Sequence, residues 1–225
     1  MHKRILIMIG WLTLFSALIA MIIGHSGSHD LNWTINQIST YAAGAPHDRW
    51  ITASMLLSCL TLVSISLMVS SKILGDNYLT YMAPLFAGAT IAGLLTLAGY
   101  EETAGSMRIL RSSGFEAIRQ QSFHDAGLLI FFYSAVALAV VLGILIMAQA
   151  SGWKEKIIGG VVALLGTAAF PLMTTAWPGL IGLLSAGPGL KQRASLLSIW
   201  LAILLVLAVA SSKIFQPSRP LTRRG

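Results

Sequence analysis

Six long apolar segments, separated by more polar stretches, dominate the pattern of this chain. A helix needs about 20 consecutive apolar residues to cross the hydrocarbon core of a bilayer, and each segment is about that long. The pattern therefore predicts an all-α, polytopic integral membrane protein whose single domain is a bundle of six transmembrane helices. The predicted spans are Ile5–Gly24, Trp50–Ser71, Tyr81–Tyr100, Ala126–Ala148, Ile157–Trp177 and Ala194–Ser212.

The connectors between the predicted spans differ in length. Two connectors, both predicted on the outer side of the membrane, are long and polar: His25–Arg49 and Glu101–Asp125. Long connectors commonly carry function on a rigid scaffold. The second has room for a short helix over 106–122 that lies along the membrane surface. The third outer connector, Pro178–Arg193, is apolar and rich in glycine and proline, and we expect it at the interface.

Composition and charge agree with a membrane location. The chain is 56% hydrophobic and 10% charged, whereas soluble domains carry about 25% charged residues. The basic residues flank the apolar segments, so the net charge of +7 indicates orientation in a bilayer and not a nucleic-acid partner. With the N-terminus inside, nine Lys and Arg side chains lie on the inner side and six on the outer side. This bias predicts a multi-pass protein of the cell (inner) membrane with both termini cytoplasmic, including the basic tail 213–225.

Several function classes find no support in the sequence. No predicted span has a charged residue in its interior, which counts against ion pumps and proton-coupled carriers. No phosphate-binding loop, dinucleotide fingerprint or nucleophile elbow occurs. The single cysteine, Cys59, excludes an intrachain disulfide. Whether the protein is an enzyme stays open at this point.

Three of the four aspartates directly follow a histidine, and all three pairs fall in connectors predicted on the outer side. The pairs are His29-Asp30, His47-Asp48 and His124-Asp125. One interpretation is helix capping, because Asp48 and Asp125 each precede a predicted span and a carboxylate there accepts bonds from free backbone N–H groups.

A second interpretation is an outward-facing polar pocket. His47 and His124 begin spans from the same side, so we expect them to approach one another together with Tyr41 and Arg193. Neutral imidazoles and a carboxylate suit zinc or another transition metal, with His29, His47 and His124 as ligands. Their spacing matches no known metal signature, and an organic or lipid ligand is the alternative. Apart from such a metal, no cofactor is indicated.

The stretch Ser39-x-Tyr41-x-x-Gly44-x-Pro46-His47, followed by an apolar span, resembles the first outer loop of the bacterial and archaeal membrane proteins grouped as domain of unknown function family 998. Similar features of this family recur later in the chain: His124 at the fourth span, Gly189-x-x-Gln192-Arg193 before the sixth, and Trp200 within the sixth. The resemblance implies a six-span architecture but no reaction. The predicted ligand-binding residues are Ser39, Tyr41, His47, His124, Asp125, Gln192 and Arg193.

Three functions from different classes fit these observations. The first is a membrane protein that binds a lipid, a small amphiphile or a protein partner at its outer face, with apolar walls and a few polar groups. The second is a zinc-dependent membrane-embedded hydrolase similar to the ceramidase-like superfamily, although the histidines here lie at span ends and lack that family's spacing. The third is an accessory subunit of a larger membrane complex. The sequence does not choose among them.

Overall fold

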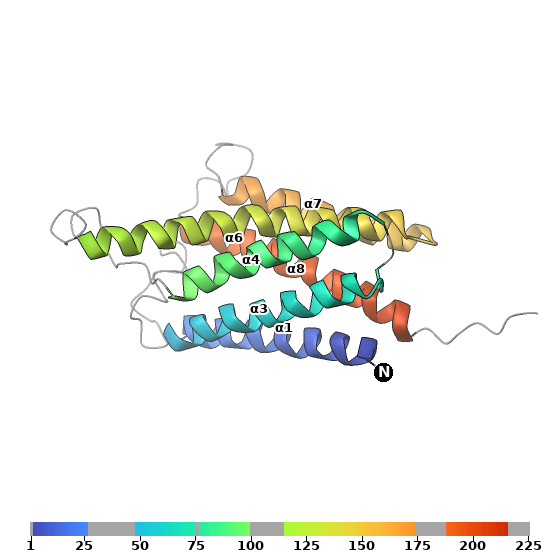
Figure 1. Cartoon of the computed structure of the whole chain (residues 1–225), viewed down its shortest axis with the longest axis horizontal. Helices are drawn as coiled ribbons and strands as arrows, with labels where there is room; N and C mark the ends of the chain where they lie inside the picture. The colour runs from blue at the N-terminus through green and yellow to red at the C-terminus, as the bar shows by residue number, and fades with distance from the viewer. Residues whose placement is uncertain (1, 27–47, 75–76, 100–114, 174–187, 216–225) are drawn as a thin grey trace, which may run out of the picture.

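The computed structural model describes residues 2–26, 48–74, 77–99, 115–173 and 188–215, without the side chains at 48, 115–121, 173, 188–189 and 215. Its helices are α1 (His2–Ser26), α3 (Asp48–Ser70), α4 (Leu79–Gly99), α6 (Phe115–Ala148), α7 (Trp153–Met173) and α8 (Pro188–Phe215). All six are long and apolar enough to cross a membrane, and the described residues contain no strand. The helices run along the long axis of the molecule (Figure 1). The predicted all-α, six-span fold is confirmed.

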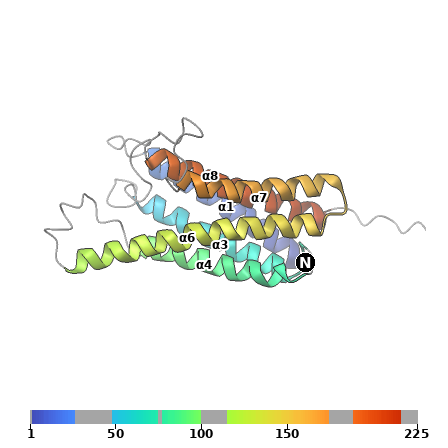
Figure 2. The same ribbon diagram turned by 90° about the horizontal axis from the view of Figure 1, so that it is seen from above.

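The helices pack in chain order around a ring. Each contacts the next, and α1 contacts α8 to close the ring. The indole Nε1 of Trp11 donates a hydrogen bond of 3.0 Å to the Ser211 hydroxyl across this closure. Because α8 also contacts α6, α7 lies outside an inner ring of five helices and packs against α6 and α8 (Figure 2).

The bundle has two ends, which we name by residues they carry. At the His124 end α1, α4 and α7 finish, and α3 and α8 begin; the Lys213 end is the opposite one. The helix α6 projects beyond its neighbours at the His124 end (Figures 1 and 2). It is continuous from Phe115, so residues 115–122 do not belong to a separate helix and the helix does not begin at Ala126. The reason is local: residues 116–125 include no glycine or proline that would interrupt a helix.

This continuity corrects one interpretation of the His-Asp pairs. Asp125 lies in the interior of α6, where backbone N–H groups already have partners in the preceding turn, so its predicted role as a helix cap is wrong. Asp48 is the first residue of α3. Its side chain is not described, and its capping role stays a prediction.

The helix α8 begins earlier than the hydropathy pattern indicates. Its first residue is Pro188, and proline suits the first turn of a helix because its missing N–H would have no partner there. Gln192 and Arg193 are therefore helical and do not belong to a connector. Pro171 lies within α7, which continues to Met173; the predicted end at Trp177 falls outside the described residues.

Small residues bring two pairs of helices into backbone contact. A Cβ atom at Gly93 of α4 would lie 2.5 Å from the backbone N of Phe131 in α6, and one at Gly143 of α6 would lie 2.6 Å from the carbonyl O of Gly159 in α7. Such close approach is how membrane helices gain packing energy where lipid is as apolar as their side chains. Gly88 of α4, in contrast, faces open space.

Hydroxyl groups join α1 to α3. The Ser54 Oγ donates to the carbonyl O of Ala17 at 2.8 Å, and the Thr13 and Thr61 hydroxyls lie 2.8 Å apart. In a bilayer such bonds contribute about 0.6–2 kcal/mol each. These bonds hold α1 and α3 together and fix the position of the α3 face that points into the inner ring.

Candidate functional site

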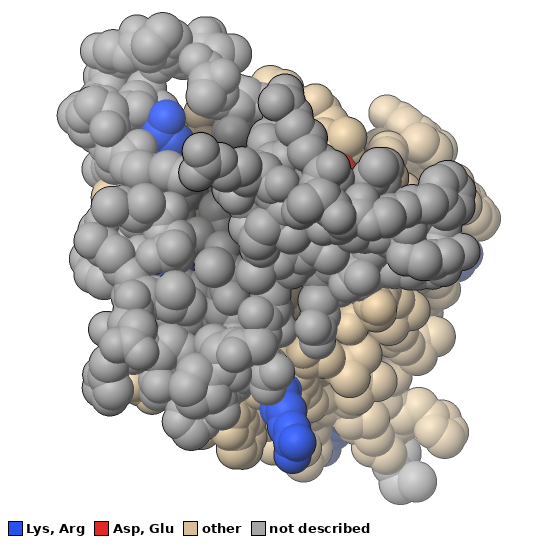
Figure 3. Space-filling view, turned by 90° about the vertical axis from the view of Figure 1, so that its left-hand side faces the viewer, with Lys and Arg blue, Asp and Glu red and all other residues tan. Residues whose placement is uncertain are grey.

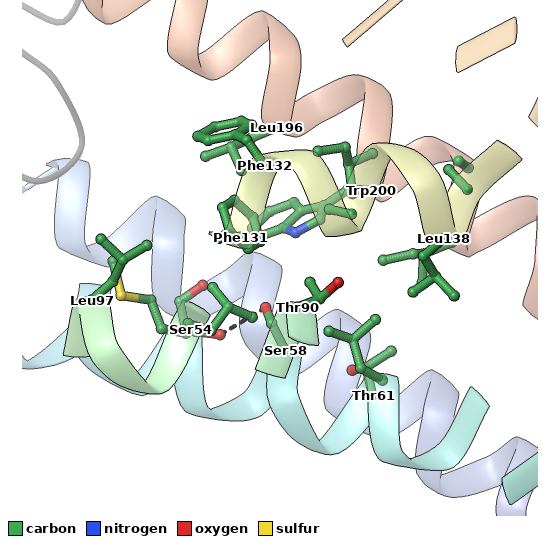
Figure 4. Close-up of a pocket in the computed structure, with 18 of the residues that line it drawn as sticks. Ser54, Ser58, Thr61, Thr90, Leu97, Phe131, Phe132, Leu138, Leu196 and Trp200 are labelled. Atoms are coloured by element: carbon green, nitrogen blue, oxygen red, sulfur yellow. Dashed lines mark hydrogen bonds between the residues drawn. The ribbon is translucent and has the colours of Figure 1, made fainter. Parts of the chain in front are cut away.

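The helices of the inner ring line a partly open cavity of about 70 Å³. Side chains of α1, α3, α4, α6 and α8 line it, whereas α7 contributes none. The cavity extends along the bundle from His124 and Gln192 at the His124 end to Leu142 and Val206 deeper inside. Figure 4 shows its central part.

The size of the cavity limits what it can hold. About 10–15 Å³ is enough for one water molecule, so about 70 Å³ accommodates several waters or a slender part of a ligand. Pockets for drug-sized molecules measure about 300–1,000 Å³. The shape therefore suits a narrow, elongated group such as a hydrocarbon chain.

One wall of the cavity carries hydroxyl groups. Ser54, Ser58 and Thr61 of α3 face into it, and Figure 4 shows them across from aromatic side chains that include Phe131 and Trp200. The remaining lining is mostly leucine, isoleucine and phenylalanine. The cavity is thus an apolar channel with one polar side.

The hydroxyl groups on this wall donate their protons to the backbone. On α3, Ser58 Oγ donates to the carbonyl O of Ser54 at 2.8 Å. Thr90 of α4 also lines the cavity, and its Oγ1 donates to the carbonyl O of Phe86 at 2.7 Å. A hydroxyl oxygen has two acceptor positions in addition to its one proton. The polar wall therefore offers hydrogen-bond acceptors and favours a ligand that carries a donor.

Four polar side chains gather at the His124 end. His124 of α6 and Gln192 of α8 are 4% and 6% exposed and both line the cavity. Arg193 follows Gln192 and lies close enough to His25 of α1 for the two to interact electrostatically. The Nδ1 of His25 lies 2.8 Å from the carbonyl O of Met21, which itself lines the cavity.

Charge at this end is mainly positive among the side chains that are described. Arg49, Lys191 and Arg193 are basic and Asp125 is acidic. Figure 3 looks onto this end and shows two clear groups of basic side chains beside the residues drawn in grey.

The predicted site residues divide into two sets. His124 and Gln192 line the same cavity. Arg193, the next residue after Gln192, is half-buried, and Asp125 is exposed; neither belongs to the lining. The others fall outside the described residues: His29, Ser39, Tyr41 and His47. The shared pocket of His47 and His124 with Tyr41 and Arg193 therefore stays a prediction.

The same holds for the predicted metal site. The described residues contain no group of three His, Cys, Asp or Glu side chains placed to hold a metal ion. Of the three predicted ligands only His124 is described, and His29 and His47 lie outside the described residues. The zinc-hydrolase hypothesis, like the accessory-subunit hypothesis, remains a prediction of the sequence.

Sequence reasoning missed the cavity itself. Ser54, Ser58 and Thr61 recur three and four positions apart, which places them on one helix face, and such a stripe by itself indicates only helix packing. In the structure the stripe packs against α1 and also lines the cavity: Ser54 and Thr61 form hydrogen bonds to α1, and all three side chains face the cavity. Thr90 gave no comparable signal within its apolar span.

Comparison with known proteins adds a family and no activity. A family model described as a protein of unknown function (DUF998) matches residues 11–209. No curated protein and no solved structure matches the chain. The matched stretch includes every residue that lines the cavity.

Proposed function

The chain belongs to the DUF998 family of proteins of unknown function, as the resemblance predicted, and we propose that it binds a lipid or another slender amphiphile inside its membrane bundle. The observation that carries this proposal is the cavity of the inner ring. It is narrow and apolar, has acceptors along one wall, and ends at two buried polar side chains, His124 and Gln192. These features match the two parts of an amphiphile.

The polarity of the cavity sets the orientation of the ligand. Its chain lies between α3, α4, α6 and α8, and its head lies at the His124 end beside Gln192 and Arg193. A guanidinium group pairs well with a phosphate or carboxylate because its donors match the spacing of two anionic oxygens. We therefore infer an anionic head.

Polar contacts, and not burial of the chain, decide the affinity. A chain that leaves the bilayer for an apolar cavity exchanges one apolar environment for another, so the hydrophobic effect contributes little. Hydrogen bonds in membranes contribute about 0.6–2 kcal/mol each. The acceptors of Ser54, Ser58 and Thr90 thus favour an amphiphile with a hydroxyl or amide N–H near its head.

Trp200 lines the cavity and can report on its contents. In a variant that keeps Trp200 as the sole tryptophan, we expect phosphatidylglycerol with brominated acyl chains to quench the indole fluorescence, because bromine quenches on contact. After dilution into detergent micelles free of brominated lipid, the quenching should persist, since a cavity-bound chain leaves more slowly than a surface lipid.

The matched control keeps Trp153 as the sole tryptophan. Trp153 is 68% exposed and lies at the Lys213 end, so its quenching should vanish as soon as surface lipids are diluted. Quenching of Trp200 that disappears as fast as that of Trp153 would contradict the proposed cavity ligand.

We also propose that the Lys213 end and both termini are cytoplasmic and that the His124 end faces outward across the cell (inner) membrane. The basic residues near the ends of the chain support this orientation. A reporter active only in the cytoplasm should work when fused at Gly225 and fail when inserted within residues 101–114. The reverse pattern would place the cavity mouth on the cytoplasmic side.

A further inference from the structure

A second hollow lies between α6 and α7, on the outside of the inner ring. This groove of about 200 Å³ is bordered by Leu129, Tyr133 and Val136 of α6 and by Ala169 and Phe170 of α7. Leu129, Tyr133 and Phe170 are 57%, 56% and 41% exposed. In a six-span bundle such exposed apolar side chains face the bilayer, so the groove is open to lipid chains.

The position of the groove follows from how α6 and α7 pack. Towards the Lys213 end the two backbones touch through Gly143 and Gly159, and a Cβ atom at Gly166 would lie 2.7 Å from the Cβ of Ala139. Beyond Gly166 large side chains replace the glycines, and the rings of Tyr133 and Phe170 lie 5.8 Å apart. Side chains of this size hold the backbones apart, and the groove occupies the space that results.

Two side chains separate this groove from the cavity. Leu128 and Phe132 line both hollows, and Phe132 is 8% exposed, with its ring 4.8 Å from that of Phe131. A wall that is one side chain thick opens when that side chain moves to another staggered rotamer.

We propose that the groove is a lateral portal through which the hydrocarbon chain of a membrane amphiphile passes from the bilayer into the cavity, with Phe132 as the gate. This inference rests on the proposed function and adds the route and the source of the ligand. The occupant is a lipid chain because the groove lies at the depth of the span, where hydrocarbon and not water surrounds the protein.

The free energy of transfer from lipid indicates that the groove is a passage for the hydrocarbon chain and not a binding site for it. An apolar chain gains little by moving from lipid into an apolar groove, so the groove conducts the chain without holding it. The chain is retained only when the head reaches the polar groups at the His124 end. Changes in the groove should therefore alter the rates of uptake and release together, whereas occupancy at equilibrium stays the same.

Exchange of the brominated phosphatidylglycerol, followed by stopped-flow fluorescence of the sole Trp200, tests the portal. A Val136→Phe variant narrows the groove at a position that does not line the cavity. It should slow uptake and release about tenfold, the effect of raising a barrier by about 1.4 kcal/mol. The matched control Val161→Phe places the same ring on the lipid-facing side of α7 and should leave both rates unchanged.

The opposite change, Phe132→Ala, removes the gate and should accelerate both rates. Unaltered rates in Val136→Phe, with persistent quenching of Trp200 in the parent, would overturn the portal and leave the proposed function standing. Absence of persistent quenching in the parent would overturn both. Because Val136 lies outside the cavity lining, this variant decides the question even if Phe132→Ala fails to fold.

Discussion

One added phenyl ring, in a Ser58→Phe variant, is expected to displace the bound amphiphile while the bundle stays folded. Ser58 lines the cavity and its hydroxyl bonds only within its own helix, so its replacement breaks no bond between helices. About 70 Å³ cannot hold both the ring and a chain. Overpacking costs about 1–3 kcal/mol, and a loss of binding free energy of that size corresponds to a fall in lipid retention of about 5-fold to 150-fold.

Retained lipid is measured by native mass spectrometry of the detergent-purified protein. The same ring placed by Ala92→Phe on the exposed side of α4 should leave retention unchanged, and Ser58→Ala should change it little because the space remains. If Ser58→Phe retains as much lipid as Ala92→Phe, the ligand does not occupy this cavity.

The largest loss of stability is expected from Gly143→Leu. A Cβ atom at this position would lie 2.6 Å from both the backbone N of Ala163 and the carbonyl O of Gly159. Backbone atoms cannot rotate away as a side chain can, so α6 and α7 must separate. We expect the free energy of unfolding to fall by about 3 kcal/mol, near the upper end of overpacking effects.

Gly88→Leu is the matched control. Nothing lies within 4 Å of a Cβ atom at Gly88, and leucine favours the helix over glycine by about 0.8 kcal/mol. This variant should be as stable as the parent or more so in thermal unfolding followed in detergent. Equal stability of the two leucine variants would mean that α6 and α7 do not pack through Gly143.

The number and identity of the spans were predictable because the bilayer restricts the solutions. Every backbone polar group inside it must be paired within the segment, so a long apolar stretch becomes a helix. Helix ends were less predictable, since hydropathy marks where the lipid ends and not where the helix does. Phe115 and Pro188 begin α6 and α8 well before the apolar runs, because the polar residues between favour helix in water as well.

Part of the site was also predictable from sequence. His124, Gln192 and Arg193 were singled out, and the structure brings them to one end of the bundle, two of them lining one cavity. The contribution of His47 and Tyr41 remains a prediction. The hydroxyl wall could not be predicted as part of a cavity, because a serine that bonds to its own helix looks the same in sequence whether it faces a neighbour, lipid or a cavity.

The amino-acid pattern alone predicts a six-span, all-α membrane protein with its polar chemistry concentrated in the connectors. Which helix faces contact one another depends on how the six helices pack. In water a buried face is more apolar than an exposed one, but lipid is as apolar as the protein core. Leu142 is 1% exposed and Ile144 on the same helix is 40% exposed, yet hydropathy treats them alike. The cavity therefore arises from packing: α8 contacts α6, excludes α7 from the inner ring and leaves a narrow space between the five remaining helices.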